Sequence, residues 1–531
     1  MPVTTSYPGI YIEELPSNAH TITAAPTSIT VFVGYTHPFK TQAFNTAVEL
    51  FSFTEYETNF GGLYSSNEVS NHVAYAVNEF FLNGGSHAYV VGLQPKYNGA
   101  AGSPPVAAAT ATIAGIEFTA LEPVDATPMT VTVDNLKESV SGSGNLDIAD
   151  IQIVYGTRVE TYRGVKIQPA TDAAFIDKRI GTQAQQISSL VTVKPAVGPN
   201  YGVTIPAQAG TTKAQGSPAN FVENIPAGFT TTFLAQDFDA AFEADSSLDK
   251  LHIFNIIVVP GVADNGIWSA ALAFAERRRA FVILDPPLLD VADPDPTNVL
   301  TSIGKDFDDG LFPPSPNGAL YFPYLKATDP LTGDQTELPP SGYVAGIYAK
   351  TDLNRGVWKA PAGLETVLLG TRGVVQRGRM TDMRQGTLNL IGVNCLRTFP
   401  GVGTVVFGAR SLVTANPAFE QWRYVPVRRT AMFIEDSLYD SLGWAVFEPN
   451  DEPLWFALRT TVTNFMLALF KQGAFQGSTP SQAFRVQCDS STTTQDDINN
   501  GIVNIVVAFA PLKPAEFVII HIQQLAGQLQ V

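Results

Sequence analysis

The chain has 531 residues, of which 45% are hydrophobic and 15% are charged, and its net charge is −17. Disordered chains combine low hydrophobicity with dense charge, and nucleic-acid binders carry a basic surface, so this composition argues against both classes. The length predicts about three to four domains. The share of charged residues is low against the roughly 25% of typical soluble proteins, which suggests that much of the surface is not in free water.

The ends and the cysteines of the chain indicate its compartment. The N-terminus lacks the basic and apolar regions of a secretory signal, and no stretch reaches the about 18 apolar residues of a membrane-spanning helix. Cys395 and Cys488 have no metal-ligand spacing and predict no disulfide framework. We therefore expect synthesis and folding in a reducing cytoplasm, without membrane insertion; later release by lysis stays open.

Residues 1–25 are expected to form an extended arm that several prolines punctuate. Within it, Ile10 and Ile12 alternate with Tyr11 and Glu13, as in a short strand.

Residues 26–95 have an α/β pattern. Strands are expected over Ser28–Tyr35 and Tyr89–Leu93. Between them, apolar residues at helical spacing predict a helix over Asn67–Asn83, which Gly84 ends.

The middle of the chain changes composition twice. Residues 96–220 are rich in Ala, Thr, Gly, Pro and Val and contain alternating stretches at Met129–Val133 and Ile151–Tyr155, which predict a β-rich insertion. Residues 221–340 are expected to form a second α/β block, with a strand, a helix and a strand over Ile253–Val259, Trp268–Arg279 and Phe281–Asp285.

Residues 341–531 form the last block. Helices are expected over Arg428–Leu442 and after Pro453, where Asn450 and Asp451 are available as N-caps. The second helix has one apolar face, made of Leu454, Leu458, Val462, Phe465 and Leu469. Two strands close the chain, over Ile502–Ala510 and Glu516–Gln524.

The sequence offers no catalytic, cofactor-binding or metal-binding residue, and we expect no cofactor. It lacks a phosphate-binding loop and a nucleophile elbow, and Gly401-x-Gly403 lacks the third glycine of a dinucleotide fingerprint. The six histidines are scattered, and none has a metal-ligand spacing. An α/β enzyme that uses the block around Ile253–Asp285 remains an alternative, although nothing recommends it.

Charge is unevenly distributed. Residues 341–531 hold 16 basic and 14 acidic side chains, whereas residues 1–340 hold 16 and 35, a net of −19. The stretch 350–429 has a net charge of +8. Such polarity suits oriented contacts with other copies or partners, and a solvated basic loop is the alternative. Nucleic acid is not expected, because aromatic residues do not interleave with the arginines of this stretch, Arg372, Arg377, Arg379 and Arg384.

Both ends of the chain contain segments of high β-propensity. Tyr7–Leu15 belongs to no obvious local hairpin, and Phe517–Ile522 is strongly β-prone. Unpaired strands are a liability, so each segment either closes a sheet within its own chain or pairs with a neighbouring chain. The residues alone leave both possibilities open.

Several motifs resemble the tail sheath proteins of contractile phage-type machines. The opening YPGIYIEELPS and the later FFLNGGSHAYVVGL are similar to the start of that family. PPSGYVAGIYAKTD, GVWKAPAG, LRTFPGVGTVVFGARSL, FEPNDEPLWFALRTTV and APLKPAEFVIIHI resemble its middle and C-terminal signatures. The similarity covers roughly residues 1–95 and 341–531, is weaker over 225–340 and is absent from 96–215. One departure is QGTLNLIGVN, where the family usually has an asparagine-proline pair.

The resemblance implies a multidomain α/β fold, in which N- and C-terminal blocks build a sheath core and 96–220 is an outward-facing insertion. It also implies a structural, non-enzymatic protein that stacks as hexameric rings around an inner tube and contracts. Its partners would be further copies, the tube protein, and baseplate and terminal cap proteins. A phage virion, a released particle and a type VI-like system all remain open, as does a host-binding role for the insertion.

The same resemblance implies particular contact residues. Terminal arms would exchange strands between subunits, through Pro8, Gly9, Ile10, Tyr11, Ile12, Glu13 and Glu14 at one end and Phe517, Val518, Ile519, Ile520 and Ile522 at the other. Candidate contacts to the tube or to neighbours are Arg372, Arg377, Arg379, Arg384, Arg459 and Lys471.

Overall fold

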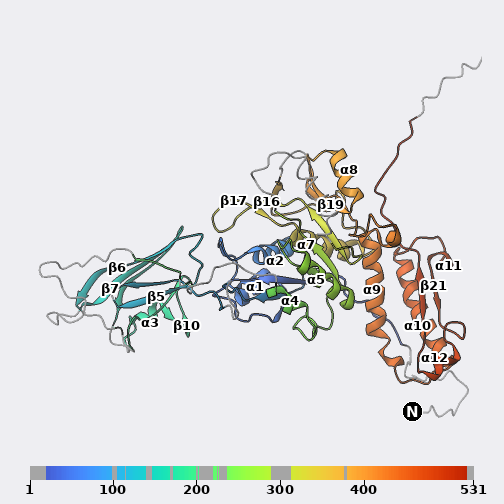
Figure 1. Cartoon of the computed structure of the whole chain (residues 1–531), viewed down its shortest axis with the longest axis horizontal. Coiled ribbons are helices and arrows are strands. Elements are labelled where there is room, and N and C mark those ends of the chain that lie inside the picture. The colour runs from blue at the N-terminus through green and yellow to red at the C-terminus, as the bar shows by residue number, and fades with distance from the viewer. Residues whose placement is uncertain are drawn as a thin grey trace, which may run out of the picture. The chain divides into compact units, whose positions relative to one another are not determined.

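The computed structural model describes residues 20–97, 104–113, 115–138, 146–167, 172–198, 201, 219–223, 225, 236–288, 313–375 and 380–522 (Figure 1). These residues form two compact units. The large unit comprises Thr27–Arg355 and Ala360–Val425, and the C-terminal unit contains residues 20–26, 356–359 and 426–522 of the described chain.

The large unit is built on one eight-stranded sheet with the order β2-β3-β1-β13-β14-β15-β19-β20. The six inner strands run parallel, and β2 and β20 are antiparallel edges. Buried apolar runs such as TVFVGY in β1 are typical of strands that are covered on both faces. The bounds are β1 Thr30–Tyr35, β2 Ala47–Leu50, β3 Ala88–Leu93, β13 Ile256–Val258, β14 Phe281–Leu284, β15 Gly318–Phe322, β19 Val393–Phe399 and β20 Gly403–Val406.

The helices of the large unit include two that approach each other closely. A Cβ added to Gly342 of α7 would lie 2.6 Å from the Cα of Ala76 in α2, so only glycine permits this approach.

Helix α2 begins at His72, five residues later than expected. The helices are α1 Phe53–Phe60, α2 His72–Leu82, α4 Gln236–Phe242, α5 Asn265–Arg278, α7 Ser341–Arg355, α8 Asp382–Leu390 and η1 Pro417–Trp422, and a small sheet joins β16 Leu325–Thr328, β17 Gln335–Leu338 and β18 Thr371–Val374.

Between β3 and α4, the described chain is β-rich, as its alternating pattern predicts. Antiparallel sheets with the orders β11-β5-β4 and β12-β6-β7-β8 enclose an apolar cluster that includes Phe118 and Ile151. The elements are β4 Thr110–Ile113, β5 Ile116–Ala120, β6 Met129–Glu138, β7 Leu146–Tyr155, β8 Arg158–Lys166, α3 Ile176–Arg179, β9 Gly181–Thr182, β10 Gln185–Gln186, β11 Val191–Pro195 and β12 Ala219–Asn220. We call this part the insertion.

The C-terminal unit contains the long helices α9 Val425–Ser441 and α10 Glu452–Lys471. Asp451 is the N-cap of α10 and accepts a hydrogen bond from the Leu454 amide, as expected of this residue type. All five residues of the expected apolar face are buried. The remaining elements are η2 Gly443–Ala445, α11 Pro480–Ala483, β21 Phe484–Gln487, α12 Gln495–Asn499 and β22 Val506–Phe509.

Candidate assembly surfaces

Among its described residues, the C-terminal unit has a small two-stranded sheet. β21 and β22 pair antiparallel, with Phe484 opposite Phe509 and Gln487 opposite Val506. The alternate residues Phe484, Val486, Val507 and Phe509 pack against the apolar cluster that contains Val462 and Phe465 of α10. Within the described chain, no third strand pairs with this sheet, although the Gln476 amide donates to the Ala510 carbonyl at 2.9 Å just beyond β22. A sheet edge without a neighbouring strand is a place where another strand can add.

Of the strand expected over 516–524, the structure describes residues 516–522, and these form no strand. Residues 512–522 have no regular secondary structure, and their apolar side chains point into solvent. The exposed fractions are 73% for Phe517, 80% for Val518, 77% for Ile519, 78% for Ile520 and 93% for Ile522. A strand needs a partner strand for its backbone hydrogen bonds, and none of the described strands pairs with Phe517–Ile522. We call residues 512–522 the C-terminal tail.

The N-terminal exchange residues Pro8–Glu14 lie outside the described residues. The chain is described from His20, whose ring stacks on Trp444 at a centroid distance of 3.8 Å. The Thr23 amide donates to Ser441 Oγ at 3.1 Å, and the Ala25 amide to Ser437 Oγ at 3.0 Å. Residues 20–25 are therefore fixed along the end of α9, a contact that the sequence did not reveal.

The described basic candidates are divided between the two units. Arg372 is exposed on β18 and Arg384 is half-buried on α8, both in the large unit, whereas Lys471 is exposed in the last turn of α10. The Arg459 guanidinium donates to the Cys488 carbonyl at 2.6 Å and lies 3.7 Å from Glu452 Oε1, so it stabilises its own unit. Arg377 and Arg379 lie outside the described residues.

In α/β enzymes, ligands bind at the carboxyl ends of the parallel strands. In this sheet, a deeply buried carboxyl lies at such an end. Asp285 follows β14 and accepts hydrogen bonds from the Gly261 amide at 2.9 Å and from the Ser341 amide and hydroxyl at 2.8 and 2.5 Å. Burial raises the pKa of this carboxyl to about 6, against the effect of those hydrogen bonds. These contacts show that Asp285 fixes the start of α7, which is a structural role.

The described residues contain no group of three metal-ligating side chains that could hold an ion. In the same part of the chain, no helix has the length and hydropathy needed to span a bilayer.

Comparison with known protein families shows to which family this chain belongs. The model of the phage tail sheath protein central domain matches residues 243–412, and that of the phage tail sheath C-terminal domain matches residues 418–524. Together they cover just over half of the sequence. The chain belongs to the phage tail sheath protein family. The resemblance of its motifs is thereby confirmed.

Curated relatives of this sheath protein are distant. It is 24% identical over 267 residues to a putative prophage major tail sheath protein of Pseudomonas aeruginosa and 26% identical over 182 residues to a tail sheath protein of Vibrio phage KVP40. A tail sheath protein of Burkholderia phage BcepMu is 27% identical over 202 residues. The matched stretches span 62%, 25% and 40% of these proteins, less than two thirds of each.

Solved structures share the fold over nearly the whole chain. The helical sheath of the anti-feeding prophage in its contracted state matches 98% of this chain and 100% of its own, with a TM-score of 0.57 and 23% identity. The sheath of an extracellular contractile injection system in the contracted state covers 98% and 99%, with a TM-score of 0.56 and 21% identity. A sheath tail protein from Desulfitobacterium hafniense covers 95% and 100%, with a TM-score of 0.53 and 12% identity. The expected α/β sheath fold is confirmed.

Proposed function

We propose that this protein is the subunit of a contractile sheath that stacks as hexameric rings around an inner tube. Shortening of the sheath drives the tube through a target envelope. Family membership and the shared fold of contracted sheaths support this proposal. The partners are further copies of the chain, the tube protein, and baseplate and terminal cap proteins, in a phage tail or a released particle. The family is a structural one, and we assign the chain no reaction.

The observation that carries the proposal is the exposed apolar C-terminal tail. Five large apolar side chains between residues 517 and 522 are at least 73% exposed. Water is an unfavourable environment for such a row, and an extended segment gains backbone hydrogen bonds by adding to the edge of another sheet. The two-stranded β21–β22 sheet has edges of the kind that would receive it. We propose that the tail of one subunit pairs with this sheet on the next.

Assembly tests the tail directly. In Ile520→Asp/Ile522→Asp, two charges replace side chains that a receiving sheet would cover, so rings and tubes should be lost from electron micrographs. Val197→Asp is the matched control, because Val197 is 87% exposed but belongs to the insertion. Tubes of normal length from the tail variant would contradict strand addition.

The N-terminal arm takes part in the same exchange in our proposal. Deleting residues 1–19 leaves the contacts of Thr23 and Ala25 with α9 in place, so the subunit should remain folded. It should nevertheless fail to form tubes. Circular dichroism checks the fold and sedimentation checks the assembly; sedimentable polymers from the deletion variant would show that the arm is dispensable.

Among the basic candidates, Arg372 and Lys471 are exposed and suit contacts that must form and break, because exposed ion pairs contribute only about 0–1 kcal/mol each. We propose them, with Arg377, Arg379 and Arg384, as contacts to the tube or to neighbours. Arg459 is less suited, since its guanidinium is already engaged within its own unit.

A further inference from the structure

The insertion folds around its own apolar cluster. Phe118, Ile151 and Val193 are buried in that cluster, whereas Val31 and Trp268 belong to the cluster beside the eight-stranded sheet. Among the described residues, the two clusters have no member in common. The insertion and the sheet therefore do not depend on one shared core.

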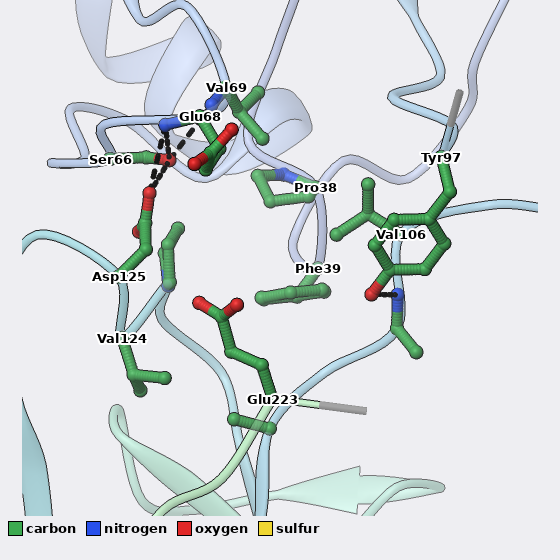
Figure 2. Close-up of a pocket in the computed structure, with 13 residues that line it drawn as sticks. Pro38, Phe39, Ser66, Glu68, Val69, Tyr97, Val106, Val124, Asp125 and Glu223 are labelled. Atoms are coloured by element: carbon green, nitrogen blue, oxygen red, sulfur yellow. Dashed lines mark hydrogen bonds between the residues drawn. The ribbon is translucent and has the colours of Figure 1, made fainter. Parts of the chain in front are cut away.

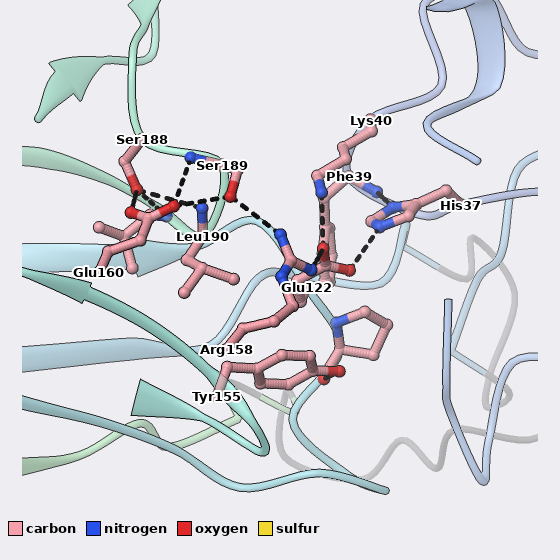
Figure 3. Close-up of polar contacts among 12 residues, drawn as sticks. His37, Phe39, Lys40, Glu122, Tyr155, Arg158, Glu160, Ser188, Ser189 and Leu190 are labelled. Carbon is pink, nitrogen blue, oxygen red and sulfur yellow. Dashed lines mark hydrogen bonds and ion pairs between the residues drawn. The ribbon is translucent and has the colours of Figure 1, made fainter. Parts of the chain in front are cut away.

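A buried carboxylate joins the insertion to the remainder of the large unit, built on the eight-stranded sheet, which we call the sheet domain. Glu122, just after β5, is only 3% exposed, and its Oε1 accepts from Lys40 Nζ at 2.6 Å. Its Oε2 lies 3.0 Å from His37 Nε2. Because the Phe39 amide donates to His37 Nδ1, the neutral ring carries its proton on Nε2 and donates it to Glu122. Figure 3 shows His37 and Lys40, from the loop after β1, converging on this carboxylate.

The insertion holds the same carboxylate from its own side. Arg158 of β8 donates from Nη1 to Glu122 Oε1 at 2.8 Å and from Nη2 to Ser189 Oγ at 2.9 Å. Burial alone would raise the pKa of Glu122, but the hydrogen bond from His37 and the charge of Lys40 lower it to about 2. Glu122 is thus ionised at any ordinary pH. We call Glu122, His37, Lys40 and Arg158 the Glu122 cluster.

A second polar contact lies nearby, with a cavity beside it. Asp125 Oδ2 accepts from Ser66 Oγ at 2.7 Å and from the amides of Asn67 and Glu68 at 2.6 and 2.9 Å. The cavity has a volume of about 30 Å³, and Asp125 and Glu68 help to line it. Figure 2 shows the Glu223 carboxylate and the Phe39 ring facing this space. Side chains that border a void lack contacts on one side, so close packing does not hold the junction together there.

We propose that the Glu122 cluster fixes the orientation of the insertion on the sheet domain, and that breaking it frees the insertion to move as a rigid body while both cores stay folded. Charged hydrogen bonds are directional, whereas apolar contact alone tolerates sliding. Removing the carboxylate leaves Lys40 and Arg158 facing each other without the anion between them, which favours separation of the two sides. In a sheath this joint would let the insertion adapt as neighbouring subunits move.

The distance between two spin labels tests this inference. One label is placed at Glu57→Cys on α1 and the other at Gln152→Cys on β7, both exposed positions. The native Cys395 and Cys488 are buried, so labelling is confined to the new sites. In the otherwise unchanged chain we expect one narrow distance distribution; in Glu122→Gln we expect its width to roughly double.

Glu160→Gln is the matched control. Glu160 accepts from the Ser189 amide and hydroxyl at 3.0 and 2.6 Å, so its contacts lie within the insertion and its loss should leave the distribution narrow. Hydrogen exchange of β6 and β7 should be the same with and without Glu122→Gln. A narrow, unshifted distribution in Glu122→Gln would overturn the inference. Lost protection of β7 in that variant would do so too, because Glu122 would then serve the fold of the insertion itself.

A second variant, on the sheet-domain side of the junction, keeps the inference testable if Glu122→Gln does not fold. Lys40→Met removes one of the two sheet-domain partners of Glu122 and leaves Glu122 bonded to His37, the other one, and to Arg158. We expect a broadening smaller than that of Glu122→Gln. If Glu122→Gln does not fold, an unchanged distribution in Lys40→Met is the result that overturns the inference.

Discussion

At the scale of single residues, three buried carboxyls of this sheath protein show how neighbours set a pKa. Glu122, with two cations and a histidine around it, has its pKa lowered to about 2 despite burial. Asp285 has three neutral donors and no cation, and its pKa is about 6. Glu79 has one oxygen without a hydrogen-bond partner among the described residues, and burial raises its pKa to about 7. The same chemical group thus stabilises the fold at one position and opposes it at another.

Because the Glu79 carboxyl is buried, we expect the free energy of unfolding to depend on pH. Its pKa rises from 4.5 in the unfolded chain to about 7 in the folded one, so the folded state holds the proton more tightly. Stability associated with Glu79 is therefore complete below about pH 4.5 and is lost as the pH rises to about 7. Glu79→Gln should remove this loss and raise the free energy of unfolding at pH 8 by roughly 3 kcal/mol, with little change at pH 4. Urea denaturation of both proteins at the two pH values measures this free energy of unfolding.

The control for this prediction is Glu57→Gln, which changes an exposed acid of α1. It should leave the difference between the two pH values unaltered. An equal effect of both substitutions would mean that overall charge, and not the burial of Glu79, decides the pH dependence.

At the scale of elements, helix α10 has the burial that its sequence pattern predicts. The five apolar residues of its expected face recur every three or four positions and are all buried, because one face of a helix meets one surface. The C-terminal tail is the opposite case: its β-propensity is high, yet the described chain has no strand there. A helix satisfies its backbone internally, whereas a strand depends on another segment.

Substitutions along α10 should separate its two faces. Phe465 is 7% exposed within the apolar cluster, and Phe465→Ala should lower the free energy of unfolding by about 3 kcal/mol through lost burial and a new cavity. Thr460→Ala, at an exposed position of the same helix, should change it by less than about 0.5 kcal/mol. Thermal or chemical unfolding of both variants checks the difference, and equal effects would contradict the assigned faces.

At the scale of the whole molecule, folding and assembly use different residues. The side chains of Phe517–Ile522 are largely exposed in the single chain, so the tail adds little to its stability. A chain that ends at Leu512 should melt within about 2 °C of the full-length protein. Under our proposal it should not form tubes. Calorimetry gives the first result and electron microscopy the second; a strongly lowered melting temperature would show that the tail packs on its own subunit.

The sequence by itself determined the local elements and the family. Periodicity placed α10, α5 and four of the six inner strands, β1, β3, β13 and β14, but not β15 and β19. Ordered motifs from both ends of the chain indicated a tail sheath protein, which the family models confirm. Only the tertiary structure decided which segments meet. It joined β1, β13 and β19, far apart in sequence, in one sheet, and it placed Glu122 against His37 across 85 positions. Hydrophobic period and cap residues report on neighbours within a few positions, whereas strand partners and buried ion pairs depend on contacts that only the folded chain creates.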